Sequence, residues 1–553
     1  MLRDNFFCYF CRPTKLDPMN SYSSVKNVIV FLVCAMICIG AFAQKVTERP
    51  AVISKEAHLY GGTYGARLIS NDPDRFYMYL FPKFNGWNAL KHRIAIYDKT
   101  SRTISYKTLT LEDDQDFIST FGTGDHFFAD YLNNSRKTGC TYGTVRLAKD
   151  KDGTLEPTPV FSLKKGWMKG ISLASPDGNM HATVLKADIR KESSRFYVYV
   201  YDKDGTEVYH KAVIPSISGN HMQFEGAFLS NSGEVAILVT SFQVDSKGPV
   251  CFQSIFSAVG WVQSMKARNT SLHLAIVNEE GIIEKQIPHF SFGDIHSADI
   301  VGLQNGNYFI GGYYGPDPFT PTTGYFSCLF DRNVEDLAGT YHYRLPAEQL
   351  TRTDGCSQFF TLANKIYELD NGQIVMLGEN CAICIRNIMN STQYYCLAGD
   401  IVYQTFDQTG EGGESQVIRK LQGFARYQSL QRRTSEYFAF DYNFKDFCLS
   451  FSSFRKGNDI YLLYNNSLSP DDMFYLNNNM GYVDFDNSRN LCVRLAKISP
   501  NSEVERETVM KCDTHKNFLL NLWLVDDKEV YFSTLAHKSY IIESFSTATA
   551  RND

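Results

Sequence analysis

The feature that most constrains this chain is a short hairpin pattern that recurs along most of its length. In each copy an apolar strand runs into a turn containing Gly with Asp, Asn or Ser, and a second apolar strand follows. The clearest copies are LASPDGNMHATVL from Leu173, AFLSNSGEVAILV from Ala227, IVGLQNGNYFIGG from Ile300, IYELDNGQIVMLG from Ile366 and FSSFRKGNDIYLL from Phe451. Self-similarity of this kind indicates that one β-sheet unit is repeated along the chain.

A second hairpin pattern, with a polar turn, alternates with the first. Its copies begin at Arg93, Thr144, Tyr197, His273, Ser327 and Cys492. Together the two patterns describe a meander of four strands, a to d, with tight a–b and c–d turns, and radial repetition of such a sheet leaves only short, protected edges. From Lys45 to the C-terminus the chain therefore resembles secreted β-propeller proteins with degenerate blades.

The number of hairpins predicts seven or eight four-stranded blades. Seven a–b hairpins are clear when those near Asp74 and Leu522 are included, and an eighth, weaker one lies near GTGDHFFADYL. About three strands fit after Phe518, and a spare strand follows Lys45, so we expect an N-terminal strand to complete the last blade. Packed β-sandwich domains remain the alternative, because regular short strands fit either architecture.

Composition agrees with an all-β fold. Aromatic residues make up 14% of the chain, including 33 Tyr and 40 Phe, which suit half-buried sheet positions. No stretch after the N-terminal segment sustains a helical apolar period for four turns. We therefore expect residues 44–553 to form a single propeller domain with long b–c loop insertions.

The N-terminal segment predicts export. An apolar run from Asn27 follows Lys26 and ends in Ala41-Phe42-Ala43, a pattern typical of a signal-peptidase site. We expect residues 1–43 to be a signal peptide, with Met19 as an alternative start, and the product to be periplasmic, on the cell surface or extracellular. An uncleaved anchor is the competing interpretation. No second transmembrane segment is evident in the sequence.

The net charge and the spacing of the cysteines limit the partners, metals and cofactors that we expect the chain to bind. The formal net charge is −5 and no basic run occurs, so we expect no nucleic-acid partner. Cys492 and Cys512 are symmetric about a turn near Asn501, which predicts that they lie opposite each other as a disulfide. Cys381, Cys384 and Cys396 lack a fourth ligand at suitable spacing, so neither a metal site nor a cofactor is expected.

Long b–c loops are the expected binding surface, because loops on a rigid scaffold concentrate binding residues. All of them would project on one face of a propeller. They carry aromatic residues that suit sugars or protein partners. These are Trp87, Trp261, Phe319, Tyr394, Tyr395, Phe474, Tyr475 and Tyr482. The alternative is that these rings bury one another within the insertions.

Two short segments combine carboxylates with imidazoles. GTGDHFFAD contains Asp125, His126 and Asp130, and PHFSFGDIHSAD contains Asp294, His296 and Asp299. Either segment could line the mouth of the central channel and supply acid/base groups for glycosidic chemistry. Buried structural histidines and solvated carboxylates are the other interpretation, since the spacing matches no recognised motif.

No catalytic motif identifies a reaction: the chain contains no G-x-S-x-G elbow, H-E-x-x-H helix or P-loop. The first hypothesis is therefore an exported recognition or scaffold module that binds a glycan or envelope protein through its loop-rich face. The alternative is a carbohydrate-active enzyme that uses carboxylates at the channel mouth. A mainly structural partner in a surface complex is a third hypothesis, and the oligomeric state stays open.

Overall fold

The computed structural model places most of the chain after the N-terminal segment. It describes residues 57–58, 63–82, 92–109, 115–123, 126–135, 139–149, 158–164, 167–188, 195–216, 221–244, 267–288, 290–316, 321–346, 349, 360–388, 391–420, 422–427, 451–467, 474–479, 482–484, 491–500, 504–511, 516–525, 529–536 and 539–546. All of these belong to one compact unit, Thr47–Asp553. Every element in them is a β-strand, as the composition predicts. The predicted signal peptide lies outside these residues.

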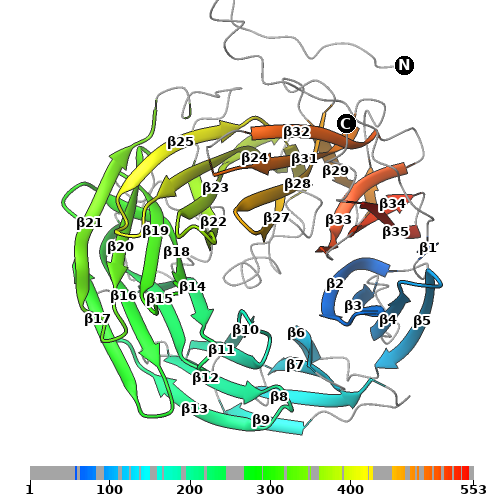
Figure 1. Cartoon of the computed structure of the whole chain (residues 1–553), viewed down its shortest axis with the longest axis horizontal. Coiled ribbons are helices and arrows are strands. Elements are labelled where there is room, and N and C mark those ends of the chain that lie inside the picture. Colours follow the sequence, from blue (N-terminus) through cyan, green and yellow to red (C-terminus); the bar gives the residue numbers. More distant parts are fainter. Residues whose placement is uncertain are drawn as a thin grey trace, which may run out of the picture. The chain divides into compact units, whose positions relative to one another are not determined.

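The first five sheets are consecutive four-stranded antiparallel meanders. They comprise β2 (Thr63–Asn71), β3 (Arg75–Pro82), β4 (His92–Asp98) and β5 (Thr103–Leu109); β6 (Gln115–Thr123), β7 (His126–Ser135), β8 (Gly139–Ala148) and β9 (Thr158–Leu163); β10 (Trp167–Ala174), β11 (Met180–Asp188), β12 (Arg195–Asp202) and β13 (Glu207–Val213); β14 (His221–Leu229), β15 (Val235–Val244), β16 (Ala267–Val277) and β17 (Ile282–Pro288); β18 (Asp294–Gly302), β19 (Tyr308–Gly315), β20 (Gly324–Phe330) and β21 (Asp336–Arg344). Figure 1 shows them following one another around a ring.

Three more sheets complete the ring, so the described strands form seven four-stranded sheets and one seven-stranded sheet. The larger sheet contains β22 (Phe360–Glu368), β23 (Ile374–Ile388), β24 (Ser391–Phe406), β25 (Gly412–Ile418), β26 (Gln422–Tyr427), β29 (Phe474–Asn479) and β30 (Tyr482–Asp484). The others are β27 (Phe451–Lys456), β28 (Asp459–Ser467), β31 (Leu491–Ile498) and β32 (Val504–Lys511), then β33 (Lys516–Val525), β34 (Glu529–Ala536), β35 (Ser539–Ser546) and β1 (Ala57–His58). This β-propeller confirms the predicted fold, and separate sheets around a ring replace the sandwich alternative.

An N-terminal strand completes the last blade, as predicted. β1 pairs antiparallel with β35, with Ala57 opposite Ile542, and the inner strands β2 and β33 contact each other. The strand that does this begins at Ala57, whereas the segment we expected, from Lys45 to Ser54, lies outside the described residues. The pairing of β1 with β35 therefore closes the ring by connecting its N-terminal and C-terminal ends through backbone hydrogen bonds.

The recurring hairpins owe their sequence to turn geometry. In the first pattern the turn glycine has a positive φ, for example 72° at Gly178 and 87° at Gly306, which other residues rarely adopt. In the second pattern an Asp near the end of the third strand closes the turn: the Asp202 carboxylate accepts the backbone N–H groups of Asp204 and Thr206 at 2.9 and 2.8 Å. Both turn types are thus specified locally.

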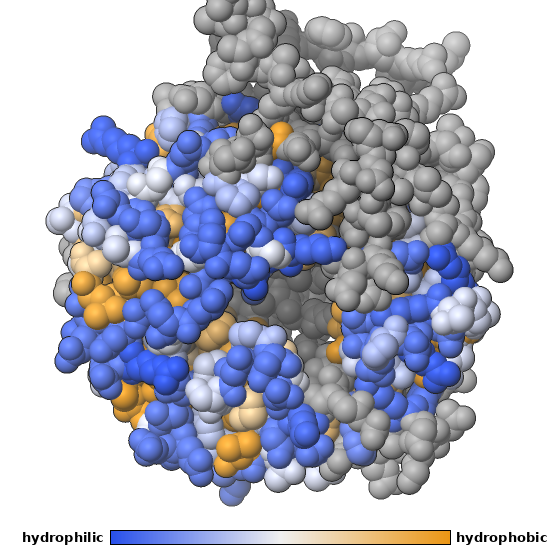
Figure 2. All heavy atoms as spheres, viewed as in Figure 1, coloured by the Kyte–Doolittle hydropathy of each residue, from blue (hydrophilic) through white to orange (hydrophobic). Residues whose placement is uncertain are grey.

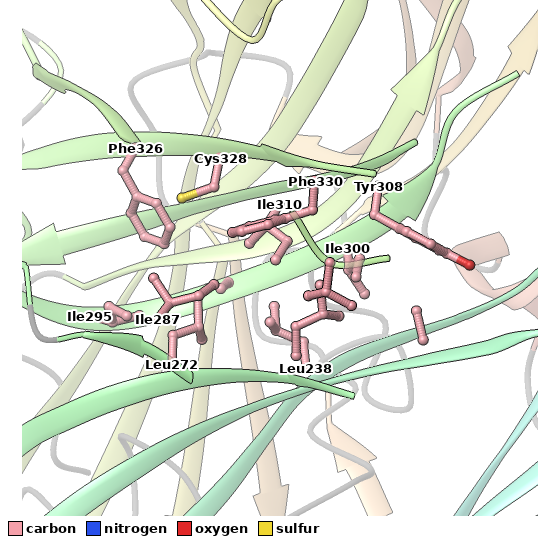
Figure 3. Close-up of a cluster of buried hydrophobic side chains, with 14 of the residues drawn as sticks. Leu238, Leu272, Ile287, Ile295, Ile300, Tyr308, Ile310, Phe326, Cys328 and Phe330 are labelled. Atoms are coloured by element: carbon pink, nitrogen blue, oxygen red, sulfur yellow. The ribbon is translucent and has the colours of Figure 1, made fainter. Parts of the chain in front are cut away.

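Apolar side chains bury themselves between neighbouring blades. Figure 3 shows one such cluster, in which Leu238 and Leu272 of one blade face Ile300, Ile310 and residues of β20 in the next. A fully buried side chain of this size contributes about 1.5–3 kcal/mol. Similar clusters lie between other blade pairs, so the core is a series of layers around the ring.

One blade grows outward into an extension that the sequence analysis expected to be loops. The stretch that carries Tyr394 and Tyr395, expected as part of a b–c loop, is instead a continuation of β23 and β24, whose pairing extends to Ile388 opposite Ser391. β26 pairs with β24, and β29, from the next blade's expected loop, pairs parallel with β26. The expectation of loops was wrong here because Ile-, Tyr- and Thr-rich runs around a short turn are themselves a hairpin signal.

Buried charges lie where this extension leaves its blade. Lys420 is fully buried and its Nζ donates to Glu379 Oε1, to Gln422 Oε1 at 3.2 Å and to the Ala398 carbonyl at 3.3 Å. Gln422 Nε2 in turn donates to the Asn465 carbonyl of the next blade at 2.6 Å. Because each group would be costly to bury alone, this network favours one position for the extension.

In the part of the chain that the structure describes, no helix is long and apolar enough to cross a membrane.

Candidate functional site

The structure separates the two acid and imidazole segments. His126 begins β7, at the opposite end of its blade from the start of the inner strand β6, and its ring lies 6.4 Å from that of Phe128. Asp125 lies outside the described residues. The segment spans the end of β6 and the start of β7, and its role at a mouth of the channel stays a prediction.

The third carboxylate of that segment is a structural hub. Asp130 is fully buried and accepts hydrogen bonds from Thr183 Oγ1 at 2.6 Å, Ser172 Oγ at 3.0 Å and Tyr142 OH at 3.2 Å, with His181 Nε2 at 3.2 Å. These donors come from two adjacent blades. Burial lowers the pKa of His181, although Asp130 opposes the shift, and raises that of Tyr142. The hub joins two blades and leaves no approach for a substrate.

The second segment lies on the inner strand β18, where Asp294 and His296 are buried. His296 occupies a bulge in the pairing of β18 with β19, and its Nδ1 is 2.8 Å from Thr322 Oγ1. Thr322 Oγ1 also accepts the Thr361 N–H of the next blade at 2.9 Å. These contacts favour the interpretation that His296 is a structural histidine that helps to join two blades.

Asp299, three residues further along β18, is different because its side chain is partly accessible. Burial raises the pKa of Asp299 to about 6. Two smaller effects lower this pKa: the positive charge of Lys365, and a hydrogen bond in which the Ile300 N–H donates to Asp299 Oδ1 at 2.9 Å. Gly226 on the neighbouring inner strand makes room for the carboxyl group: a Cβ there would be 2.5 Å from Asp299 Oδ1. A perturbed and accessible carboxyl group is a candidate functional residue.

The next inner strand brings Lys365 and Tyr367 toward Asp299. The Lys365 side chain is exposed, and its positive charge acts on Asp299. Tyr367 OH is 2.9 Å from Ser453 Oγ on β27. Burial raises the pKa of Tyr367 to about 12, with Asp299 adding to the shift, so the phenol stays protonated at neutral pH. Three adjacent inner strands therefore carry acid, amine and hydroxyl groups that act on one another electrostatically or by hydrogen bonding.

A second carboxylate comes from a β-bulge. Glu225 is the extra residue where the pairing of β14 with β15 shifts, between Phe224 and Gly226. Its Oε2 accepts the Ala298 N–H of β18 at 3.1 Å, directly before Asp299. Bulges commonly redirect a side chain, and this one holds β14 against β18.

We name these five partly or fully accessible side chains the inner-strand cluster: Glu225, Asp299, Lys365, Tyr367 and Ser453. They lie on β14, β18, β22 and β27, the inner strands of four consecutive blades (Figure 1). In the space-filling view, hydrophilic residues cover most of the coloured surface, with smaller hydrophobic areas between them (Figure 2). Chemically the cluster can donate and accept hydrogen bonds at once, and Asp299 can exchange a proton near pH 6.

Sequence reasoning found Asp299 but missed the other four. A signal was available in the repeat itself: Gly226, Asp299 and Lys365 each lie seven positions before the turn glycine of their hairpins, Gly233, Gly306 and Gly372. Equivalent positions of successive blades are neighbours in a ring. Aligning the hairpins would therefore have placed Lys365 beside Asp299.

The structure describes the backbone of five of the eight predicted loop aromatics. Trp87, Trp261 and Phe319 lie outside the described residues. Tyr394 and Tyr395 are on β24, opposite Ile385 and Cys384, while Phe474 and Tyr475 are on β29 and Tyr482 is on β30. These five positions belong to the strand extension, and a binding role for them stays a prediction.

The predicted disulfide is shifted in register. A bulge between Val493 and Arg494 places Cys492 opposite Lys511, one position from Cys512, and Cys492 Sγ donates to the Asn466 carbonyl at 3.5 Å. Cys512 lies outside the described residues, so the bond itself stays a prediction. Within the described ranges, no group of three His, Cys, Asp or Glu residues could hold a metal ion.

No protein-family model and no curated protein matches the sequence. Among solved structures the chain is similar to an ulvan lyase, a polysaccharide lyase, with 7% identity and a TM-score of 0.38 over 82% of this chain and 96% of that one. A prolyl endopeptidase has 11% identity and a TM-score of 0.33 over 72% of this chain. A thermostable family-43 glycoside hydrolase has 12% identity and a TM-score of 0.25, over 55% of this chain and 97% of that one.

The chain spans 45% of the length of the prolyl endopeptidase it matches. The similar structures include carbohydrate-active enzymes, a peptidase and proteins of unknown function. At TM-scores of this size the likenesses carry no argument about activity, which rests on the site alone.

Proposed function

We propose that this protein is an exported glycan-recognition module that holds its ligand at the middle of the ring. One observation carries the proposal: the inner-strand cluster presents accessible acid, amine and hydroxyl groups from four consecutive blades. Sugars offer hydroxyl groups that both donate and accept, and a site of mixed polarity suits them.

The residues on either side of Asp299 differ from it in burial. Ala298 and Ile300, on either side of Asp299, are buried in the apolar layer between blades. Asp299 lies between them and is partly accessible, and the rise of its pKa to about 6 on burial shows that its ionised form is costly to keep. Accessible polar groups retained against such a cost support a binding role rather than a packing role.

A carbohydrate-active enzyme is the second candidate, and the pKa of Asp299 favours it. A carboxyl group that titrates near pH 6 can act as a general acid under mildly acidic conditions. Glu225 supplies a second carboxylate on the adjacent strand. As such an enzyme, the protein would use Asp299 to protonate the leaving oxygen as the glycosidic C–O bond breaks, while Glu225 would take the proton of the water that attacks the anomeric carbon.

Export and the wider binding surface also belong to this proposal. The apolar run from Asn27 and the Ala41-Phe42-Ala43 site support secretion to the periplasm, cell surface or medium. An envelope protein could bind the loop-rich face instead of a glycan. Such a partner would not depend on the inner-strand cluster.

The test is a polysaccharide panel in which binding and released reducing sugar are measured in the same samples. The full chain is compared with Asp299→Asn and with Glu284→Gln, a matched loss of one carboxylate on the exposed outer strand β17. Binding that Asp299→Asn weakens and Glu284→Gln leaves unchanged supports recognition. Sugar release that only Asp299→Asn abolishes supports the enzyme, and a panel without any binding rejects both.

A further inference from the structure

The charges of the inner-strand cluster constrain what kind of glycan it can hold. Two of its five side chains are carboxyl groups, Glu225 and Asp299, and one is an amine, Lys365. An anionic ligand would meet two like charges, whereas a cationic ligand would meet the Lys365 amine. At neutral pH the three charges sum to −1, which disfavours an anionic glycan, and an uncharged glycan meets no like charge in the cluster.

Lys365 acts electrostatically on Asp299, but the two side chains do not form an ion pair. Lys365 is the main charged neighbour that acts on Asp299, and their strands β18 and β22 are in contact. Among the ion pairs of the described residues, none joins these two groups. Each therefore keeps hydrogen-bonding capacity that a ligand could use.

The remaining groups add hydroxyls without adding charge. Tyr367 stays protonated at neutral pH because burial raises its pKa to about 12, and its oxygen is already within 2.9 Å of Ser453 Oγ. Gly226 leaves room for the Asp299 carboxyl itself, since a Cβ there would be 2.5 Å from Asp299 Oδ1. A ligand with adjacent donor and acceptor groups fits this arrangement.

We propose that the glycan is neutral and that two of its hydroxyl groups bridge the cluster, one donating to the Asp299 carboxylate and one accepting from Lys365 Nζ. This inference rests on the proposed function and deepens it. A sugar with neighbouring hydroxyls supplies both contacts from one ring. An acidic glycan could use Lys365 but would place its carboxylate or sulfate against Asp299 and Glu225.

The experiment compares neutral with acidic polysaccharides at neutral pH, at low and at high salt. The probes are mannan and β-glucan on one side and polygalacturonate and hyaluronan on the other. The variants are Asp299→Asn and Lys365→Met in the full chain. Glu284→Gln and Lys285→Met are matched controls, because both replace exposed residues on the outer strand β17. Circular dichroism and thermal unfolding confirm that each variant folds.

The expected result is binding to a neutral polysaccharide that salt hardly changes. Asp299→Asn and Lys365→Met should each weaken it about tenfold, since each removes a charge-assisted hydrogen bond. Preferential binding to acidic probes that salt weakens, with Lys365→Met reducing and Asp299→Asn increasing affinity, would overturn this inference and leave glycan recognition standing. An absence of binding to every probe would overturn the proposed function as well.

Discussion

Replacing Asp299 by asparagine should stabilise the protein at neutral pH and leave its stability almost unchanged in acid. Burial raises the pKa of Asp299 from 3.8 to about 6 in the folded state. Between these two values the folded protein binds more protons at this position than the unfolded chain does. Stability from this group is therefore fully present below about pH 4 and is lost as pH rises through about 6.

The magnitude follows from the shift. Each pKa unit corresponds to about 1.4 kcal/mol, so a shift from 3.8 to about 6 amounts to roughly 3 kcal/mol as an upper limit. The side chain is partly accessible, and solvent screening reduces this to about 1–3 kcal/mol. Asparagine cannot ionise, so Asp299→Asn should remove that cost at neutral pH.

The assay is chemical denaturation of wild type and Asp299→Asn at pH 4, 6 and 7.5, with the difference in unfolding free energy as the readout. Titration of every other group cancels in that difference. Glu284→Gln, on the exposed outer strand, should give a difference near zero at each pH. A difference for Asp299→Asn that does not grow between pH 4 and 7.5 would refute the reasoning about its pKa.

Three further substitutions probe the scaffold and the site by denaturant unfolding, and ligand affinity is measured as well for the third. Asp130→Ala removes the acceptor of a buried hydrogen-bond hub and should destabilise by about 3–5 kcal/mol; a loss below 1 kcal/mol would mean that the hub does not join its blades. Lys420→Met leaves Glu379 buried without its cation and should cost about 3–5 kcal/mol, whereas adding Glu379→Gln should recover part of the loss; additive costs would contradict a direct pair. Gly226→Ala should displace the Asp299 carboxyl group and weaken ligand binding about tenfold with little loss of stability, and unchanged affinity would place the ligand elsewhere.

Prediction from sequence succeeded where a structure is specified by neighbouring residues. The turn glycines such as Gly178 and Gly306 have the positive φ that their hairpins require, and the alternation of two hairpin types led to four-stranded blades. Prediction failed at the extension, because the run around Ile388 and Ser391 was read as a loop. It also missed the shifted register at Cys492, since a bulge leaves little trace in sequence.

The sequence by itself determined the repeating hairpins, the blades and the completion of the last blade by an N-terminal strand. Only the tertiary structure decided which polar side chains are buried and which are accessible. Asp130 and Asp299 look alike in sequence, yet one is enclosed by donors from two blades and the other is partly accessible beside Lys365. The physical reason is that a turn depends on a few adjacent residues, whereas the surroundings of a carboxyl group depend on how separate blades pack around the ring.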